Sequence, residues 1–176
     1  MLPLAVTLLL AAVAVVLLVV YMTGQHPAQA VNGVTCDSQE HASGRDVVHY
    51  HAHLTILVGG TEATVSSNIG IPSTYNCIYW LHTHDTTGVI HVEAPKSAAR
   101  DFTLGDFFKV WDKPLSRTNV AGVQLSGDQQ LVIFVDGKRV DTDPAKIVLK
   151  PHEQIVLEVT PPVIDPPPSY TFPPGL

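Results

Sequence analysis

A continuous alternation of side-chain types runs through the segment Val47–Val58. Because successive side chains of a β-strand point to opposite faces, the alternation predicts one long strand with two unlike faces. The mainly apolar face carries Val48, Tyr50, Ala52, Leu54, Ile56 and Val58, and the other face carries His49, His51, His53 and Thr55. Gly59 and Gly60 follow, and together with residues 61–65 they predict a hairpin return of the chain.

Further strand signals continue to the end of the predicted domain. The additional predicted strands cover residues 78–84, 89–93, 131–135, 138–140, 147–149 and 154–159. The turn Asp85-Thr86-Thr87-Gly88 joins the first two, and Asp136-Gly137 joins the next two. Since Asp-Gly supplies the positive φ angles of a type I′ turn, the second junction is a strong hairpin signal.

Residues 103–111 predict the one principal helix, because Thr103 can cap its start and Pro114 ends it. Its large apolar residues recur at helical spacing and should pack onto the sheet: Leu104, Phe107, Phe108 and Trp111. The predicted fold class is β-rich α+β, an antiparallel sheet or small barrel with one principal helix, plus one N-terminal transmembrane helix.

Residues 2–22 contain no charged side chain. A helix of that length, at ~1.5 Å per residue, crosses a hydrocarbon core of ~30 Å. A cleavable signal peptide is the alternative, because Ala28-Gln29-Ala30 has the small-x-small pattern of a cleavage site. We favour a retained anchor, since the apolar run is longer than a signal-peptide core and no Lys or Arg precedes it. Either interpretation exports the rest of the chain.

The chain divides into four predicted regions. They are a transmembrane anchor or signal peptide (1–23), a tether (24–44), an extracytoplasmic β-rich histidine-cluster domain (45–160) and a Pro-rich C-terminal tail (161–176). The protein would be a single-pass protein of the cell membrane, with the membrane and a membrane protein as its expected partners. The net charge of -6 argues against nucleic acid as a partner. The tail would be an extended strap anchored by Tyr170 and Phe172, or a partner-binding segment.

Cys36 and Cys77 are the only cysteines of the chain. In an exported domain an even number of cysteines is most simply a disulfide. Thiolate ligation or redox chemistry is the alternative, but no CxxC spacing supports it. We therefore expect Cys36 and Cys77 to be bonded.

The histidines are concentrated in one part of the sequence. Six of the nine fall between residues 49 and 91, namely His49, His51, His53, His82, His84 and His91. A solvated strand face or a polar core network would explain single histidines. A cluster needs another cause, because crowded imidazoles repel one another when protonated and lose solvation when neutral. The concentration therefore predicts a metal site.

The hairpin register sharpens this prediction. If the turn covers residues 85–88, then His82 lies opposite His91, and His84 lies one step away on the same face. His82, His84 and His91 would then converge on one ion, with at least one of the three histidines of the long strand within reach. The candidates for a fourth ligand or a supporting carboxylate are Asp85, Glu93, Glu40 and His152.

The predicted cofactor is a transition-metal ion, copper or zinc, because imidazole suits both. Met1 and Met22 are the only methionines, which argues against a thioether-rich Cu(I) site. The favoured function is an extracytoplasmic metal-binding protein, an accessory subunit or metal-delivery partner of a membrane complex. The alternatives are a three-histidine metalloenzyme with an open water position and a metal-free interaction subunit.

Four sequence blocks resemble a family of small membrane-anchored or secreted prokaryotic proteins. The family is marked by HxHxHL, CxYWLHTHDxxGxIHxE, LGxFFxxW and YxFPxGL motifs, which here fall at residues 49–54, 77–93, 104–111 and 170–176. The resemblance covers most of the exported part. It implies that these blocks belong to one domain, and it implies no activity or ligand.

Overall fold

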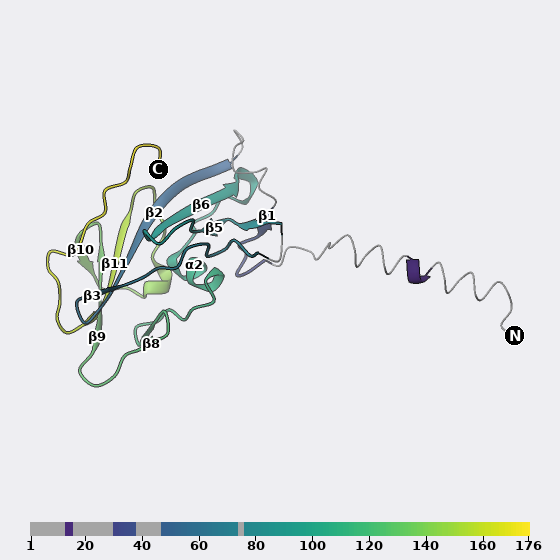
Figure 1. Cartoon of the computed structure of the whole chain (residues 1–176). Coiled ribbons are helices and arrows are strands. Elements are labelled where there is room, and N and C mark those ends of the chain that lie inside the picture. The colour runs from purple at the N-terminus through teal and green to yellow at the C-terminus, as the bar shows by residue number, and fades with distance from the viewer. Residues whose placement is uncertain (1–12, 16–29, 38–46, 74–75) are drawn as a thin grey trace, which may run out of the picture.

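The computed structural model describes residues 13–15, 30–37, 47–73 and 76–176 (Figure 1). The predicted anchor and tether lie mostly outside these residues. Among the described residues, no helix combines the length and apolar character needed to cross a membrane.

A seven-stranded sheet forms the centre of the domain (Figure 1). Its strands run in the order β10 (Lys138–Val140), β9 (Gln130–Val135), β11 (Gln154–Thr160), β2 (Val47–Val58), β6 (Val89–Pro95) and β5 (Leu81–His82), and β3 (Thr61–Ala63) pairs with β2. The β-rich prediction is confirmed. Strand β2 has the bounds predicted from its alternation and lies in the interior of the sheet.

The predicted hairpins are present. The Gly59-Gly60 turn lets β3 return beside β2, with Val58 opposite Thr61. Asp136 and Gly137 both have positive φ angles, of 48° and 72°, as a type I′ turn requires. The local turn residues therefore set these two registers.

Two expectations about the strands are wrong. The sheet is mixed rather than antiparallel, because β11 runs parallel to β2. Residues 147–149 do not form a strand. They follow the short 3-10 helix η3 (Pro144–Lys146), and they meet the segment before α2 through the Thr103–Val148 bridge and a hydrogen bond from Leu149 N to Phe102 O. This segment therefore pairs with the start of the helix instead of extending the sheet.

Helix α2 (Leu104–Val110) is the predicted principal helix. Thr103 caps it, and Thr103 and Asp106 form a capping box in which each side chain bonds the other residue's backbone N–H. Phe107 and Phe108 are buried in the main core together with Leu54 of β2. Helix α2 packs against η3 and β5 and shares a core with the apolar face of β2, and the histidine face of β2 points to the other side of the sheet.

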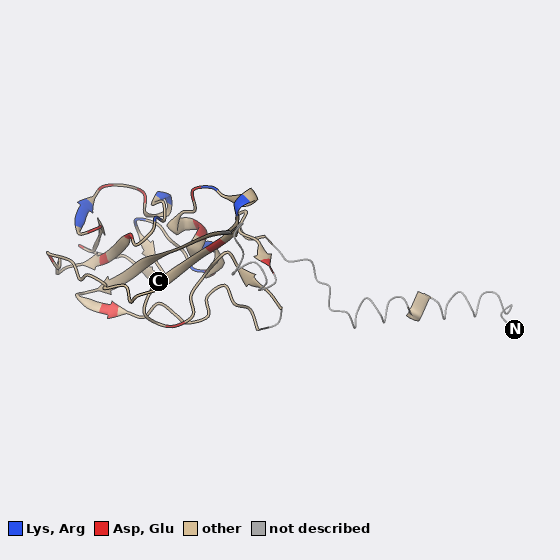
Figure 2. Cartoon of the chain, turned by 90° about the horizontal axis from the view of Figure 1, so that it is seen from above, with Lys and Arg blue, Asp and Glu red and all other residues tan. Residues whose placement is uncertain are grey.

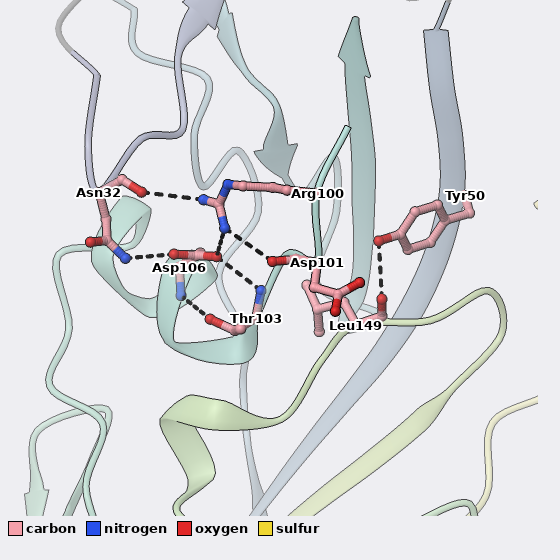
Figure 3. Close-up of polar contacts among 7 residues, drawn as sticks. All are labelled: Asn32, Tyr50, Arg100, Asp101, Thr103, Asp106 and Leu149. Carbon is pink, nitrogen blue, oxygen red and sulfur yellow. Dashed lines mark hydrogen bonds and ion pairs between the residues drawn. The ribbon is translucent and has the colours of Figure 1, made fainter. Parts of the chain in front are cut away.

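Asp106 also connects the helix to the segment before β1 (Figure 3). Its carboxylate accepts hydrogen bonds from Asn32 Nδ2 (2.5 Å), Thr103 N (2.9 Å) and Arg100 Nη1 (2.8 Å). Burial opposes ionisation of Asp106, but these donors outweigh it and hold its pKa below the ordinary value. The network fixes residues 30–34 against the domain.

Short elements complete the domain. They are β1 (Cys36–Asp37), which pairs with β4 (Ile78–Tyr79), the 3-10 helix η2 (Lys96–Ala98), and β7 (Asn119–Val120), which pairs with β8 (Val123–Gln124). The disulfide between Cys36 and Cys77 is present, with a Cα–Cα separation of 5.4 Å. It joins β1 to the residue that precedes β4, and so confirms the predicted bond.

The C-terminal tail folds back over the histidine face of β2. Tyr170 stacks on His53 with ring centroids 4.0 Å apart, and its N–H donates to Gln154 Oε1 (2.7 Å). Phe172 stacks on His152, whose Nε2 lies 2.8 Å from the Leu176 oxygen. Of the two alternatives for the tail, the strap anchored by Tyr170 and Phe172 agrees with these contacts.

Lys and Arg occur at several separate places along the ribbon of the domain (Figure 2). Blue segments mark β10 and η2, which lie toward opposite ends of the domain in this view. The net charge of the whole chain is -6.

Candidate metal centre

Three neighbouring strands hold the histidines. Strand β6 lies between β2 and β5, and His91 of β6 pairs with His51 on one side and with His82 on the other. The pairing of His82 with His91 is the register predicted from the turn at residues 85–88. Glu93, two residues beyond His91, lies opposite His49. Side chains on one face of adjacent strands lie within ~5.5 Å of each other at Cβ, so the register itself assembles the cluster.

The first group consists of His49, His51 and His91, with Glu93 beside them. His51 Nε2 lies 3.3 Å from His49 Nε2 and 3.1 Å from His91 Nδ1. Glu93 Oε1 lies 3.2 Å from His49 Nε2 and 3.6 Å from His91 Nδ1. The four atoms therefore form a closed ring of short contacts.

These separations match those of a tetrahedral metal site. Zinc bonds to nitrogen and carboxylate oxygen are ~2.0 to 2.2 Å long, so two ligands of a tetrahedral ion are about 3.3 to 3.6 Å apart. The four measured separations lie between 3.1 and 3.6 Å. The first group thus has three imidazole nitrogens and one carboxylate oxygen, and four of their six separations have the length that a tetrahedral ion gives.

The second group consists of His82, His84 and His91, whose candidate ligand atoms lie within 4.8 Å of one another. The ring of His91 is 5.1 Å from that of His82 and 4.5 Å from that of His84. His82 Nδ1 lies 2.9 Å from the Tyr79 carbonyl oxygen. Because a carbonyl only accepts, the proton is on Nδ1, and Nε2 keeps the lone pair that a metal needs. The predicted convergence of these three histidines is present.

The structure places His53 elsewhere. Its Nε2 lies 2.7 Å from the Thr87 carbonyl oxygen and its ring is covered by Tyr170. His53 is a member of neither group of candidate ligands. Its Nε2 donates to the Thr87 carbonyl and so holds the turn before β6.

The other four candidate ligands lie in different places relative to the two groups. Asp85 turns toward its own loop, where Oδ1 accepts from Thr87 N (2.9 Å) and Thr87 Oγ1 (2.5 Å). His152 contacts the tail, and Glu40 lies outside the described residues. Among the predicted carboxylates in the described part of the chain, Glu93 joins the histidines and Asp85 shapes the turn.

Burial favours the neutral form of the two most buried imidazoles of the centre. His51 and His82 are 5% and 1% exposed. Burial, assisted by the positive charge of His91 and neighbouring rings, lowers the pKa of each from 6.5 to about 4. Burial also opposes ionisation of Glu93, but its contact with His91 and the charges of His82 and His49 hold the pKa of Glu93 below its ordinary value. Neutral imidazoles beside an ionised carboxylate are the protonation states that bind metal ions.

The centre opens to solvent through two residues. His49 has a side chain 42% exposed, and His84 is also exposed. One belongs to each group, so an ion can reach either group from outside.

Sequence reasoning missed the groups that orient the rings. The Tyr79 and Thr87 carbonyls set the tautomers of His82 and His53, and backbone carbonyls leave no residue-type signal. Tyr170 was expected to anchor the tail, but its stacking on a histidine was not foreseen.

No protein-family model matches the chain, and comparisons with curated proteins and with solved structures find no significant match. The resemblance of the histidine-rich blocks to a prokaryotic family therefore stays a prediction, and the function proposed below rests on the geometry of the site.

Proposed function

We propose that this chain is a metal-binding protein for Cu(II) or Zn(II), held on the extracytoplasmic side of a membrane by residues 2–22. The observation that carries the proposal is the ring of four donor atoms from His49, His51, His91 and Glu93, separated by 3.1 to 3.6 Å. Three imidazoles with one carboxylate suit both ions, and Cu(II) is bound more tightly than Zn(II) by most such sites.

Metal delivery within a membrane complex is the role that the exposed ligands support. His49 and His84 lie at the surface of the centre, so a partner could exchange a ligand for one of them without unfolding the domain. The membrane anchor would keep the domain near such a partner.

A metalloenzyme is the second candidate function. The second group offers three histidines, and His84 is exposed, which would leave a coordination position for water. Turnover of a hydrolysable ester by the Zn(II)-loaded protein, abolished in H84A, would favour this role over delivery.

The test of metal binding uses the full chain purified in detergent with its disulfide intact. After loading with Zn(II) or Cu(II) and desalting, wild type should retain metal by elemental analysis. H91N should lose most of it, since His91 belongs to both groups. H152N is the matched control, because His152 lies in neither group and Asn tolerates its φ of 59°. A wild-type protein that retains no ion, or an H91N variant that binds like wild type, would contradict the proposal.

A further inference from the structure

His91 occupies a special place between the two histidine groups. It lies on β6, with the His49–His51 side of β2 on one flank and the His82 side of β5 on the other. It is a member of both groups, whereas His49 and His51 belong to one and His82 and His84 to the other. One ion cannot satisfy all five imidazoles, because the donor atoms gather into two groups rather than one.

The two ring nitrogens of His91 can each serve a different histidine group. Its Nδ1 faces the first group, at 3.1 Å from His51 Nε2 and 3.6 Å from Glu93 Oε1. The lone pairs of the two ring nitrogens diverge, so a ring that gives Nδ1 to one ion can give Nε2 to another on its other side. The second group lies beside this ring, with His84 edge-on at 4.5 Å and His82 nearly parallel at 5.1 Å.

We propose that the centre is dinuclear, with two divalent transition-metal ions bridged by the imidazole ring of His91. The first ion would be held by His49, His51, His91 Nδ1 and Glu93, and the second by His82, His84 and His91 Nε2. This inference rests on the proposed metal-binding function and adds the number of ions and the bridge between them.

The chemistry of the bridge balances without an oxidant or a reductant. A neutral imidazole has one N–H and one lone pair, so the first ion takes the lone pair. When the second ion binds, the remaining N–H bond breaks, a new metal–nitrogen bond forms from its electron pair, and the proton leaves to solvent. The ring then carries a negative charge between the two cations, and the Glu93 carboxylate adds a second, so that both reduce the repulsion between the ions.

Metal stoichiometry tests the two sites separately. The full chain in detergent is loaded with Zn(II) alone or Cu(II) alone, desalted and analysed for metal and protein. Wild type should hold two ions per chain, H49A should lose the first ion and keep the second, and H84A should do the reverse. Both side chains are exposed, so neither substitution should unfold the domain. H152N should hold two ions, as wild type does.

Electron paramagnetic resonance of the Cu(II)-loaded protein tests the bridge. A bridging imidazolate couples two Cu(II) spins, so the wild-type spin signal per copper should fall well below that of isolated Cu(II). H84A, with one copper, should recover the full signal per copper, and no loss of folding can imitate that recovery.

The outcomes separate the two proposals. Two ions with an undiminished spin signal would overturn the bridge. One ion per wild-type chain would overturn the dinuclear centre and leave the metal-binding function standing. A wild-type chain that retains no ion would overturn both.

Discussion

His51 and His82 are buried, so their protonated rings lack the hydration that they have in the unfolded chain, and protonation destabilises the folded protein. The pKa of each is lowered from 6.5 to about 4. In the unfolded chain these rings are protonated as the pH falls below about 6.5, whereas in the folded protein they resist protonation until about pH 4. The unfolded state therefore binds more protons in this window, and the metal-free protein loses stability as the pH falls through it.

The first prediction isolates the contribution of His51. Between pH 7 and pH 5, wild type should lose up to about 2 kcal/mol more unfolding free energy than H51N, because Asn does not titrate. Urea denaturation in the presence of a chelator measures both proteins. The comparison between variants is needed because burial raises the pKa of Glu153 and Glu158, which acts in the opposite direction. Equal pH dependence in the two proteins would show that His51 does not carry a lowered pKa.

The second prediction concerns the carboxylate of the first group. E93Q keeps the shape of Glu93 and removes the charge of the fourth donor, so the metal affinity of the first group should fall by at least roughly 10- to 100-fold, the range found when a residue that only orients a ligand is lost. Calorimetric titration with Zn(II) measures the change. E62Q is the matched control, since Glu62 is exposed on β3. An affinity of E93Q equal to that of E62Q would exclude Glu93 from the site.

For single residues, the sequence predicted those positions in the site that depend only on neighbouring residues in the chain. Period two placed His49 and His51 on one face, and Glu93 was among the proposed carboxylates. His53 shares that face but turns to the Thr87 carbonyl beneath Tyr170. His53 and Tyr170 are more than 100 residues apart in the chain, and no periodicity in the sequence predicts a contact between them.

Among the elements, helix α2 depends on one polar residue, Asp106, that accepts several hydrogen bonds at once. Asp106 accepts from Thr103 N as part of the capping box and also from Asn32 and Arg100 (Figure 3). Of these bonds, Thr103 takes part only in the two that make up the capping box. Comparing the removal of Thr103 with the removal of Asp106 therefore separates the contribution of the cap from that of the other two bonds.

The third prediction follows from this difference. T103A should lower the unfolding free energy by about 1 kcal/mol, as loss of an N-cap does. D106A should cost more, about 2 to 3 kcal/mol, because it also removes the hydrogen bonds from Arg100 and Asn32. Chemical denaturation gives both values, with T64A as the control in an exposed loop. If T103A is as damaging as D106A, the wider network contributes nothing.

Sheet order was less predictable than strand position. The turns at residues 85–88 and 136–137 set the registers of neighbouring strands, because a short turn leaves few alternatives. The parallel neighbour of β2 is β11, whose position depends on everything that lies between them in the chain. Residues 147–149 have the apolar composition of a strand but are taken up by the start of α2.

At the scale of the whole molecule, the C-terminal tail lies over the histidine face of the sheet. Tyr170 covers His53 and Phe172 covers His152, so residues 170–176 rest on the domain at two aromatic contacts. His53 is 6% exposed with this cover in place.

The fourth prediction is that Y170A releases the strap. Loss of the stacking and packing should cost about 1 to 3 kcal/mol and expose residues 161–176 to protease. Amide hydrogen exchange of the segment should speed up, and metal stoichiometry should stay unchanged because His53 is in neither group. S169A, at an exposed neighbouring position, should behave as wild type. Unchanged exchange in Y170A would mean that the aromatic contacts do not hold the tail.

The parallel pairing of β2 with β11 has a consequence for how the protein reaches its native state. Partners such as His53 and Gln154 are about a hundred residues apart along the chain, so the middle of the sheet closes only after a large loop has been ordered. Domains dominated by such distant pairings refold in milliseconds to seconds, not microseconds. The hairpin with His82 and His91 needs only a short loop, so these two histidines can meet early, whereas β2 acquires its second long neighbour late. A newly synthesised chain would therefore spend its slowest folding step with part of the histidine cluster already assembled.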